Sequence, residues 1–198
     1  MRGEQMANDA QFSSSEPESR HDGSTVWLLG FVLVCAAVSL ALGAYSRGHV
    51  PTGRPISTFG VSTMLDMKVW LASAALVLAI VQLGTALRIY GRVGRGPCPP
   101  AIAITHRVSG VVAVTLTLPV AFHCMWSLGF GSYNARVLVH SLMGCLFYGV
   151  FVTKMLTVKS SRVPGWALPV LGGALFTSLV IIWSTSSLWF FTHGSPSY

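Results

Sequence analysis

Residues 104–129 read ITHRVSGVVAVTLTLPVAFHCMWSLG, and Arg107 is the only Lys, Arg, Asp or Glu in this stretch. A helix needs about 20 apolar residues to cross a hydrocarbon core of about 30 Å, so the stretch is long enough to span a bilayer. Four other runs reach this length, near residues 25–45, 68–88, 135–157 and 166–190. The sequence therefore predicts an all-α integral membrane bundle of five transmembrane helices.

The overall composition favours the same class. Of the 198 residues, 52% are hydrophobic and 10% are charged, and the mean hydropathy is +0.62. A soluble domain carries about a quarter charged residues. The 13 Lys and Arg residues are scattered singly between apolar runs, so we expect the lipid bilayer as a partner and no nucleic acid.

The segments around the five runs predict three regions. Residues 1–24 are rich in Ser, Glu and Asp and poor in large apolar side chains, which is typical of a disordered tail. Residues 25–191 form the transmembrane domain, and residues 192–198 form a short C-terminal tail. More arginine than lysine, with abundant Ala, Gly and Val, suggests a bacterial protein that crosses the plasma membrane several times.

The basic residues also predict the orientation. Cytoplasmic loops carry an excess of Lys and Arg. With the N-terminus inside, nine bases lie on the cytoplasmic side (Arg2, Arg20, Arg88, Arg92, Arg95, Arg107, Lys154, Lys159 and Arg162) and four lie outside (Arg47, Arg54, Lys68 and Arg136). We therefore expect the N-terminus inside, with a cytoplasmic tail, and the C-terminus outside.

Acidic residues are almost confined to the N-terminal tail. Five of the six lie before residue 23, the sixth is Asp66, and no carboxylate side chain follows it. Proton- and cation-coupled transporters usually place an Asp or Glu inside the bilayer. The sequence therefore disfavours a transporter and directs attention to the histidines.

Two histidines at matched depth predict a haem site. His123 lies about six residues before the end of the third helix, and His140 about five residues after the start of the fourth, so both lie roughly 8–9 Å below the outer interface. Because loop 130–134 is short, we expect these helices to be antiparallel neighbours whose imidazoles face each other. Two such imidazoles can bind the iron of haem b from both axial positions.

Two neighbouring residues fit this interpretation. Gly144 lies on the same helical face as His140 and would let the porphyrin approach the backbone, and Arg136 is placed to bind the propionates. The run His-Cys-Met at 123–125 offers three side chains that bind copper, but successive helical residues point about 100° apart, so the three cannot converge on one ion and a copper site is disfavoured. We expect one haem, with His193 left open as an alternative ligand.

The run His106-Arg107-Val108-Ser109-Gly110-Val111 resembles the motif that opens the first membrane helix of the cytochrome b anchor subunit of succinate dehydrogenase. The resemblance implies that His106 and Arg107 bind a quinone or an anionic group at the cytoplasmic interface. The spacing His140-x-x-x-Gly144 is similar to that around the haem histidine of the same family. Histidines on adjacent helices also resemble cytochrome b561-type and ferric-reductase-type membrane proteins.

These features predict a membrane electron-transfer protein, such as a subunit of a membrane oxidoreductase, which works with a redox partner protein or subunit. The alternative is a non-redox membrane subunit that scaffolds a larger complex, with histidines that make only interhelical hydrogen bonds. His106 and His123 differ by 17 positions, about 25 Å along a helix. A quinone at the inner side would therefore reach an outer haem only if its ring or a second cofactor shortened that distance.

Overall fold

A computed structural model describes residues 19–160 and 163–194 of the chain, and these residues are helices joined by loops. Five helices are long and apolar enough to cross a membrane, and they span Val26–Gly48, Met64–Ile89, Pro100–Leu128, Ala135–Lys159 and Ala167–His193. The five predicted runs are therefore confirmed as helices, with ends that shift by a few residues. The predicted orientation stays a prediction.

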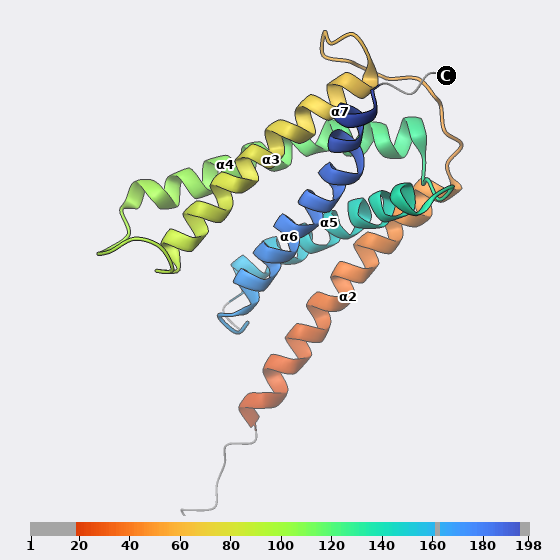
Figure 1. Cartoon of the computed structure of the whole chain (residues 1–198). Coiled ribbons are helices and arrows are strands. Elements are labelled where there is room, and N and C mark those ends of the chain that lie inside the picture. The colour runs from red at the N-terminus through yellow and green to blue at the C-terminus, as the bar shows by residue number, and fades with distance from the viewer. Residues whose placement is uncertain (1–18, 161–162, 195–198) are drawn as a thin grey trace, which may run out of the picture.

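The spans are built from the elements labelled in Figure 1. These are α2 (Ser19–Gly48), α3 (Met64–Ile89), α4 (Pro100–His123), η1 (Cys124–Leu128), α5 (Ala135–Lys159), α6 (Ala167–Trp183), η2 (Ser184–Leu188) and α7 (Trp189–His193). Helix α2 begins at Ser19, so residues 19–24 of the expected tail are helical. Residues 1–18 and 195–198, which make up most of the two predicted tails, lie outside the described residues.

Local signals explain where the helices begin and end. Thr63 caps α3 and accepts a hydrogen bond from Asp66 N at 3.0 Å, and Asn134 caps α5 and accepts one from Val137 N at 2.9 Å. Pro100 is the first residue of α4, where a missing backbone N–H is tolerated. Gly129 follows η1 with φ of 70°, a conformation that suits glycine.

Two spans contain a π-helical turn. The third span changes from α to π directly after His123, where η1 begins, and the fifth changes at Ser184, where η2 begins. Such turns are rare and are found frequently at functional sites. Both occur toward the same end of the bundle, which carries loops 49–63 and 129–134 and is called the His140 end below. The other end, with loop 90–99, the end of α5 and the start of α6, is the His106 end.

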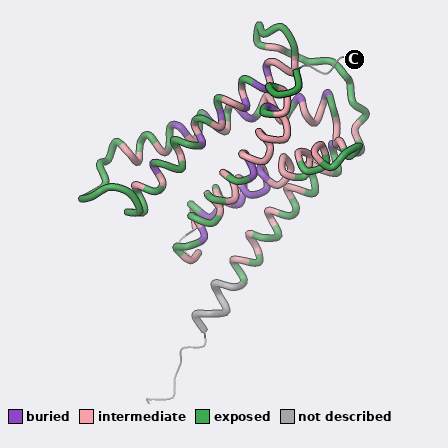
Figure 2. Tube along the Cα trace, in the orientation of Figure 1, coloured by how far each residue is buried: buried purple, intermediate pink, exposed green. Residues whose placement is uncertain are grey.

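The helices pack in two groups. Helix α3 lies along α4, while α5 lies between α2 and α6, and α6 also contacts α3. Figure 1 shows α3 and α4 side by side, spreading away from α2 and α5 toward the His106 end. In Figure 2, buried residues are concentrated where helices cross, and α2, α3 and α4 keep long exposed faces, as expected of helices that contact lipid.

The prediction that the third and fourth spans are packed neighbours is wrong. Helices α4 and α5 are joined by a short loop, yet they barely contact each other. Small residues decide the pairing instead. Gly149 of α5 lies so close to Cys35 and Ser39 of α2 that a Cβ atom at position 149 would collide with both. Close backbone approach of this kind is typical of membrane helix pairs.

A seam therefore separates α4 from α5. It is bridged by Tyr148, whose hydroxyl donates to Thr117 Oγ1 at 2.9 Å. Beside this bond lies an apolar cluster of Ala79, Phe147 and Leu179. The polar side chains that matter for function lie along the seam on either side of this central contact.

Candidate functional site

Two cavities occupy the seam. The first, of about 630 Å³, lies toward the His106 end, and the second, of about 290 Å³, lies toward the His140 end. Thr117, Phe147 and Leu179 line both cavities, so the two meet near the middle of the bundle. Mainly apolar walls with a few polar groups are typical of ligand sites. We call them the His106 cavity and the His140 cavity, after the histidine that lines each.

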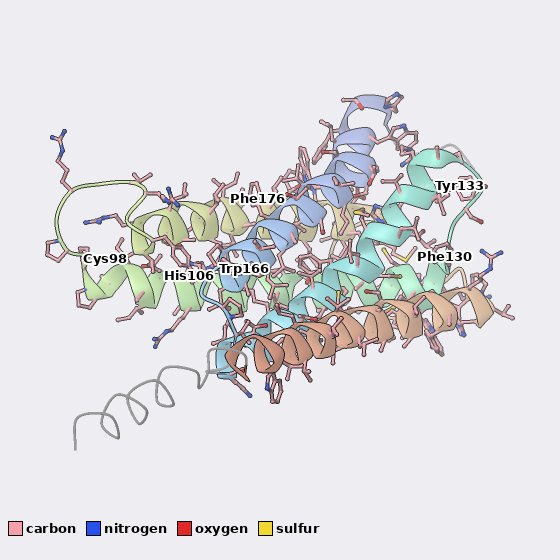
Figure 3. The ribbon with its side chains drawn as sticks, turned by 90° about the horizontal axis from the view of Figure 1, so that it is seen from below. Cys98, His106, Phe130, Tyr133, Trp166 and Phe176 are labelled. Atoms are coloured by element: carbon pink, nitrogen blue, oxygen red, sulfur yellow. The ribbon has the colours of Figure 1, made fainter. Side chains whose placement is uncertain are left out.

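The views agree on this separation. Figure 3 shows His106 on the side of the molecule that carries Cys98, and Phe130 and Tyr133 near the opposite side. Phe130 and Tyr133 line the His140 cavity. The two cavities therefore lie toward opposite ends of the spans.

His140 is held by the last span. Its Nδ1 lies 3.2 Å from Thr185 Oγ1 in η2, and Thr185 Oγ1 donates to Ile181 O at 2.7 Å. Because the single hydroxyl proton goes to that carbonyl, Thr185 accepts from the imidazole, which assigns the proton to His140 Nδ1. The Nε2 lone pair of a ring that lines the cavity is thus left available as an acceptor or a metal ligand.

Lys68, Cys124 and Gly144 join His140 in the lining of its cavity. The Cys124 thiol lies beside the side chains of Lys68 and His140. No atom lies within 4 Å of the place that a Cβ at Gly144 would occupy. The predicted pair of His140 and Gly144 therefore adjoins open space, and a flat ligand can approach the α5 backbone there.

His123 is placed differently from the prediction. Its ring is almost fully buried, its Nδ1 donates to Pro119 O at 2.7 Å, and its Nε2 accepts from Ser57 N at 3.5 Å. It lines neither cavity. No ring contact or hydrogen bond joins it to His140 in the described part of the chain, so the two expected ligands are not brought face to face.

His106 shows the same pattern as His140. Its Nδ1 lies 2.8 Å from Thr85 Oγ1 in α3, and Thr85 Oγ1 donates to Val81 O at 2.8 Å. The proton is therefore assigned to His106 Nδ1, and Nε2 keeps its lone pair. Gln82 donates to the backbone oxygen of His106 and to Ser109 Oγ, which fixes this turn of α4.

Lys154 faces His106 across the seam. The two residues come from different helices, α5 and α4, and both line the His106 cavity. Lys154 is half-buried. Asp66, the only acidic residue after position 22, lies in the first turn of α3 at the His140 end. No Asp or Glu is among the residues that line the His106 cavity with Lys154.

Three other predicted residues lie outside the cavity linings. Arg136 donates to Thr185 O, and its guanidinium lies 4.2 Å from the ring centre of Trp189. Arg107 is exposed, and His193 is exposed at the end of α7. Arg136 therefore contacts the segment that positions His140, whereas the expected pair of His106 and Arg107 does not share a site.

Two threonines and two lysines at these sites are not among the residues predicted from the sequence. Thr85 and Thr185 lie in apolar runs, where most hydroxyls simply bond to their own helix, so no local signal marks them. Lys68 and Lys154 did carry a signal, because a lysine inside a membrane span usually has a function. Lys154 and Lys68 each line one cavity, and Thr85 and Thr185 each contact the histidine of one cavity.

The chain belongs to DUF6529, a family of unknown function, whose pattern matches residues 28–197. The match includes nearly all of the five spans and both cavities. No curated protein and no solved structure matches the chain.

Proposed function

We propose that the chain is a membrane electron-transfer protein that binds haem b at the His140 end of the seam, with His140 and His123 as axial ligands. One observation carries the proposal. His140 donates a hydrogen bond from Nδ1–H to Thr185 Oγ1, whose own hydroxyl donates to Ile181 O, so Nε2 keeps its lone pair in a ring that lines the cavity. Metal-binding histidines are typically oriented in this way by their second nitrogen.

The other residues around the cavity fit a b-type haem. Gly144 leaves room for a flat macrocycle, and Lys68 supplies a cation to a cavity that has no acidic residue in its lining. Arg136 contacts the adjacent turn of η2 and keeps further N–H donors for a propionate. A bound haem would supply one-electron transfer between ferric and ferrous iron.

His123 supports the proposal through its tautomer. A carbonyl oxygen can only accept, so the 2.7 Å contact with Pro119 O puts the proton on Nδ1 and leaves Nε2 unprotonated. The only hydrogen bond that Nε2 makes is the 3.5 Å contact from Ser57 N, at the long limit for such bonds. Because the His123 ring lines neither cavity, it would have to turn toward the His140 cavity when haem binds, which would break this one long hydrogen bond of Nε2.

Quinone binding and a partner subunit belong to the same proposal. His106 lines a large apolar cavity that a quinone could enter, although Arg107 does not line it. No described segment forms a soluble domain, so electrons would be exchanged with a redox partner protein or subunit. The setting is a bacterial plasma membrane.

The test is the visible spectrum of the full chain after haem-replete expression and purification in detergent. A reduced-minus-oxidised spectrum and a pyridine haemochrome assay report haem b and its ratio to protein. We expect His140→Ala and His123→Ala to lower this ratio, and His193→Ala, an exposed control, to leave it unchanged.

Two results would overturn this assignment. If both variants keep the full haem content and spectrum, the ligands have been misassigned. If the unsubstituted protein is colourless, the proposal fails, and a subunit that scaffolds a larger membrane complex becomes the better interpretation.

A further inference from the structure

We infer that the His106 cavity binds a second haem b, whose iron is held by His106 Nε2 from α4 and by the amine nitrogen of Lys154 from α5. The inference rests on the proposed function, because it assumes that this chain is a haem protein. It departs from it at one point, because it places a second haem with a different ligand pair, rather than a quinone, in the His106 cavity.

His106 meets the requirement for a metal ligand. The Nδ1–H of His106 donates a hydrogen bond to Thr85 Oγ1 at 2.8 Å, while the Thr85 hydroxyl donates to Val81 O. This repeats, with different helices, the arrangement of His140 and Thr185. Each cavity thus has one histidine oriented by a threonine, and the third such contact in the described residues, Thr192 with His193, lies at an exposed histidine outside both cavities.

Lys154 supplies the second donor. A lysine inside a membrane span is costly unless it pairs with an anion or acts on a ligand. It can pair as an ammonium ion, or it can bind a metal as a neutral amine. Arg92 lines the same cavity just beyond α3, where it can meet the carboxylates of a haem. The amine nitrogen of Lys154 is then available to bind the iron.

Each donor lies at a similar distance from the end of its own helix, and both line the cavity between these helices. His106 lies six positions after Pro100, where α4 begins, and Lys154 lies five positions before Lys159, where α5 ends. At 1.5 Å per residue, both are roughly 8–9 Å from the His106 end. A group held between them would lie across the seam, where α4 and α5 barely contact each other.

The shape of the cavity suits a flat macrocycle. Its volume is about 630 Å³, and its walls are mainly apolar. Helix α6 presents Gly172 and Gly173 to this space. A Cβ at Gly173 would meet nothing within 4 Å, and one at Gly172 would meet only Lys154 Nζ, at 3.9 Å. The α6 backbone therefore allows a ring to approach and lies beside the Lys154 amine.

A second haem would also shorten the electron path. His106 and His123 are about 25 Å apart along α4. This distance is too long for efficient direct electron transfer between the two residues. The two cavities share Thr117, Phe147 and Leu179 as lining residues. Cofactors that fill both cavities would be separated mainly by these side chains.

The experiment measures the number of haems and the spin state of each variant of the full chain in detergent. We expect two haems per chain by pyridine haemochrome, and one in His106→Ala, with the His140 haem retained. Lys154→Leu and Lys154→Arg should both keep two haems but convert one to a high-spin form that binds carbon monoxide, seen by visible and electron paramagnetic resonance spectra. Lys159→Leu, at the end of α5, is the matched control and should leave the spectra unchanged.

The lysine variants separate the two roles of Lys154. Arginine keeps a positive charge but cannot act as an amine ligand at neutral pH. A low-spin spectrum retained in Lys154→Arg would therefore overturn ligation by Lys154. Circular dichroism and gel filtration of each variant show whether a lost haem reflects a lost fold. If His106→Ala or Lys154→Leu is misfolded, the spectrum of Lys154→Arg still decides whether Lys154 is a ligand.

Failure of the inference is distinguishable from failure of the proposed function. One haem per chain, lost in His140→Ala and kept in His106→Ala, would overturn the second site and leave the first. A quinone extracted from that one-haem protein, and lost in His106→Ala, would assign the His106 cavity to quinone. No haem at all would overturn both proposals.

Discussion

Thr185 Oγ1 accepts a hydrogen bond from His140 Nδ1 at 3.2 Å, while the Thr185 hydroxyl donates one to Ile181 O at 2.7 Å. The two residues lie 45 positions apart, on η2 and α5. Because the hydroxyl has only one proton, the contact sets the tautomer of His140 and orients its ring.

Replacing Thr185 by Val removes the acceptor and keeps the shape of the side chain. We expect haem affinity at the His140 cavity to fall roughly 10- to 100-fold, as for other residues that orient a metal-binding histidine. Transfer of haem to a colourless acceptor protein measures the loss. Thr185→Ser should restore binding, and Thr192→Val, at an exposed hydroxyl that bonds to its own helix, is the control. Equal haem retention in Thr185→Val and wild type would contradict this role.

Filling the space beside Gly144 should block the His140 cavity. A leucine at this position has no neighbour within 4 Å of its Cβ, so the apo protein can accommodate it, whereas a bound ring cannot. Overpacking costs about 1–3 kcal/mol, which is roughly 5- to 150-fold in affinity. Haem titration of Gly144→Leu measures the effect, with exposed Gly84→Leu on α3 as control. Unchanged affinity would place the haem elsewhere.

The bond between Tyr148 and Thr117 holds α5 to α4 across the middle of the seam. Tyr148→Phe removes it with little change in volume. Interhelical hydrogen bonds in membrane proteins contribute about 0.6 kcal/mol on average, and we expect a loss of that size in the free energy of unfolding. Unfolding in mixed detergent micelles measures it. Tyr45→Phe, at an exposed tyrosine, should have no effect, and equal stability of the two variants would show that the bond is unimportant.

Gly149 permits the close approach of α5 to α2, so even a methyl group should disturb the pair. A Cβ at this position would collide with Cys35 O and Ser39 Oγ, and the backbone oxygen cannot move aside without moving α2. We expect Gly149→Ala to destabilise the fold by about 1–3 kcal/mol. Thermal unfolding in detergent is the measurement, with Gly84→Ala as control. A stable Gly149→Ala variant would mean that α2 and α5 pack more loosely.

Cys98 reports the orientation of the bundle. It is exposed in loop 90–99, and the other three cysteines are only partly exposed. If the N-terminus is inside, a variant that keeps Cys98 as its only cysteine should react with a membrane-impermeant maleimide in inside-out vesicles and not in intact cells. A cysteine-free variant that carries Tyr133→Cys, in the opposite loop, should show the reverse. The opposite labelling pattern would invert the topology.

The helices themselves could be predicted because their signals are local. The length of an apolar run decides whether it spans a bilayer, and Pro100, Asn134 and Gly129 each mark a helix end through their own backbone or side chain. Loop length was a poor guide to packing. Helices α4 and α5 share a short loop, but contacts such as that of Gly149 with α2 determine which helices lie together.

The candidate site was predictable only in part. His140 and Gly144 share a cavity as expected, because positions one helical turn apart lie on one face. His106 was recognised as a site residue, but its partner in the cavity is Lys154, and Arg107 is exposed. His123 contacts Ser57, in a loop whose path no periodicity predicts.

By itself, the sequence determined the all-helical class, the five helices that are long and apolar enough to span a membrane, and the kinds of chemistry open to them. A chain with one acidic residue after position 22 must rely on histidine, lysine and hydroxyl groups inside its spans. Only the tertiary structure decided which of these groups meet. Thr85 lies 21 positions from His106, and Thr185 lies 45 from His140. The rotation and depth at which two helices pack depend on the fit of their whole faces, which no local pattern records.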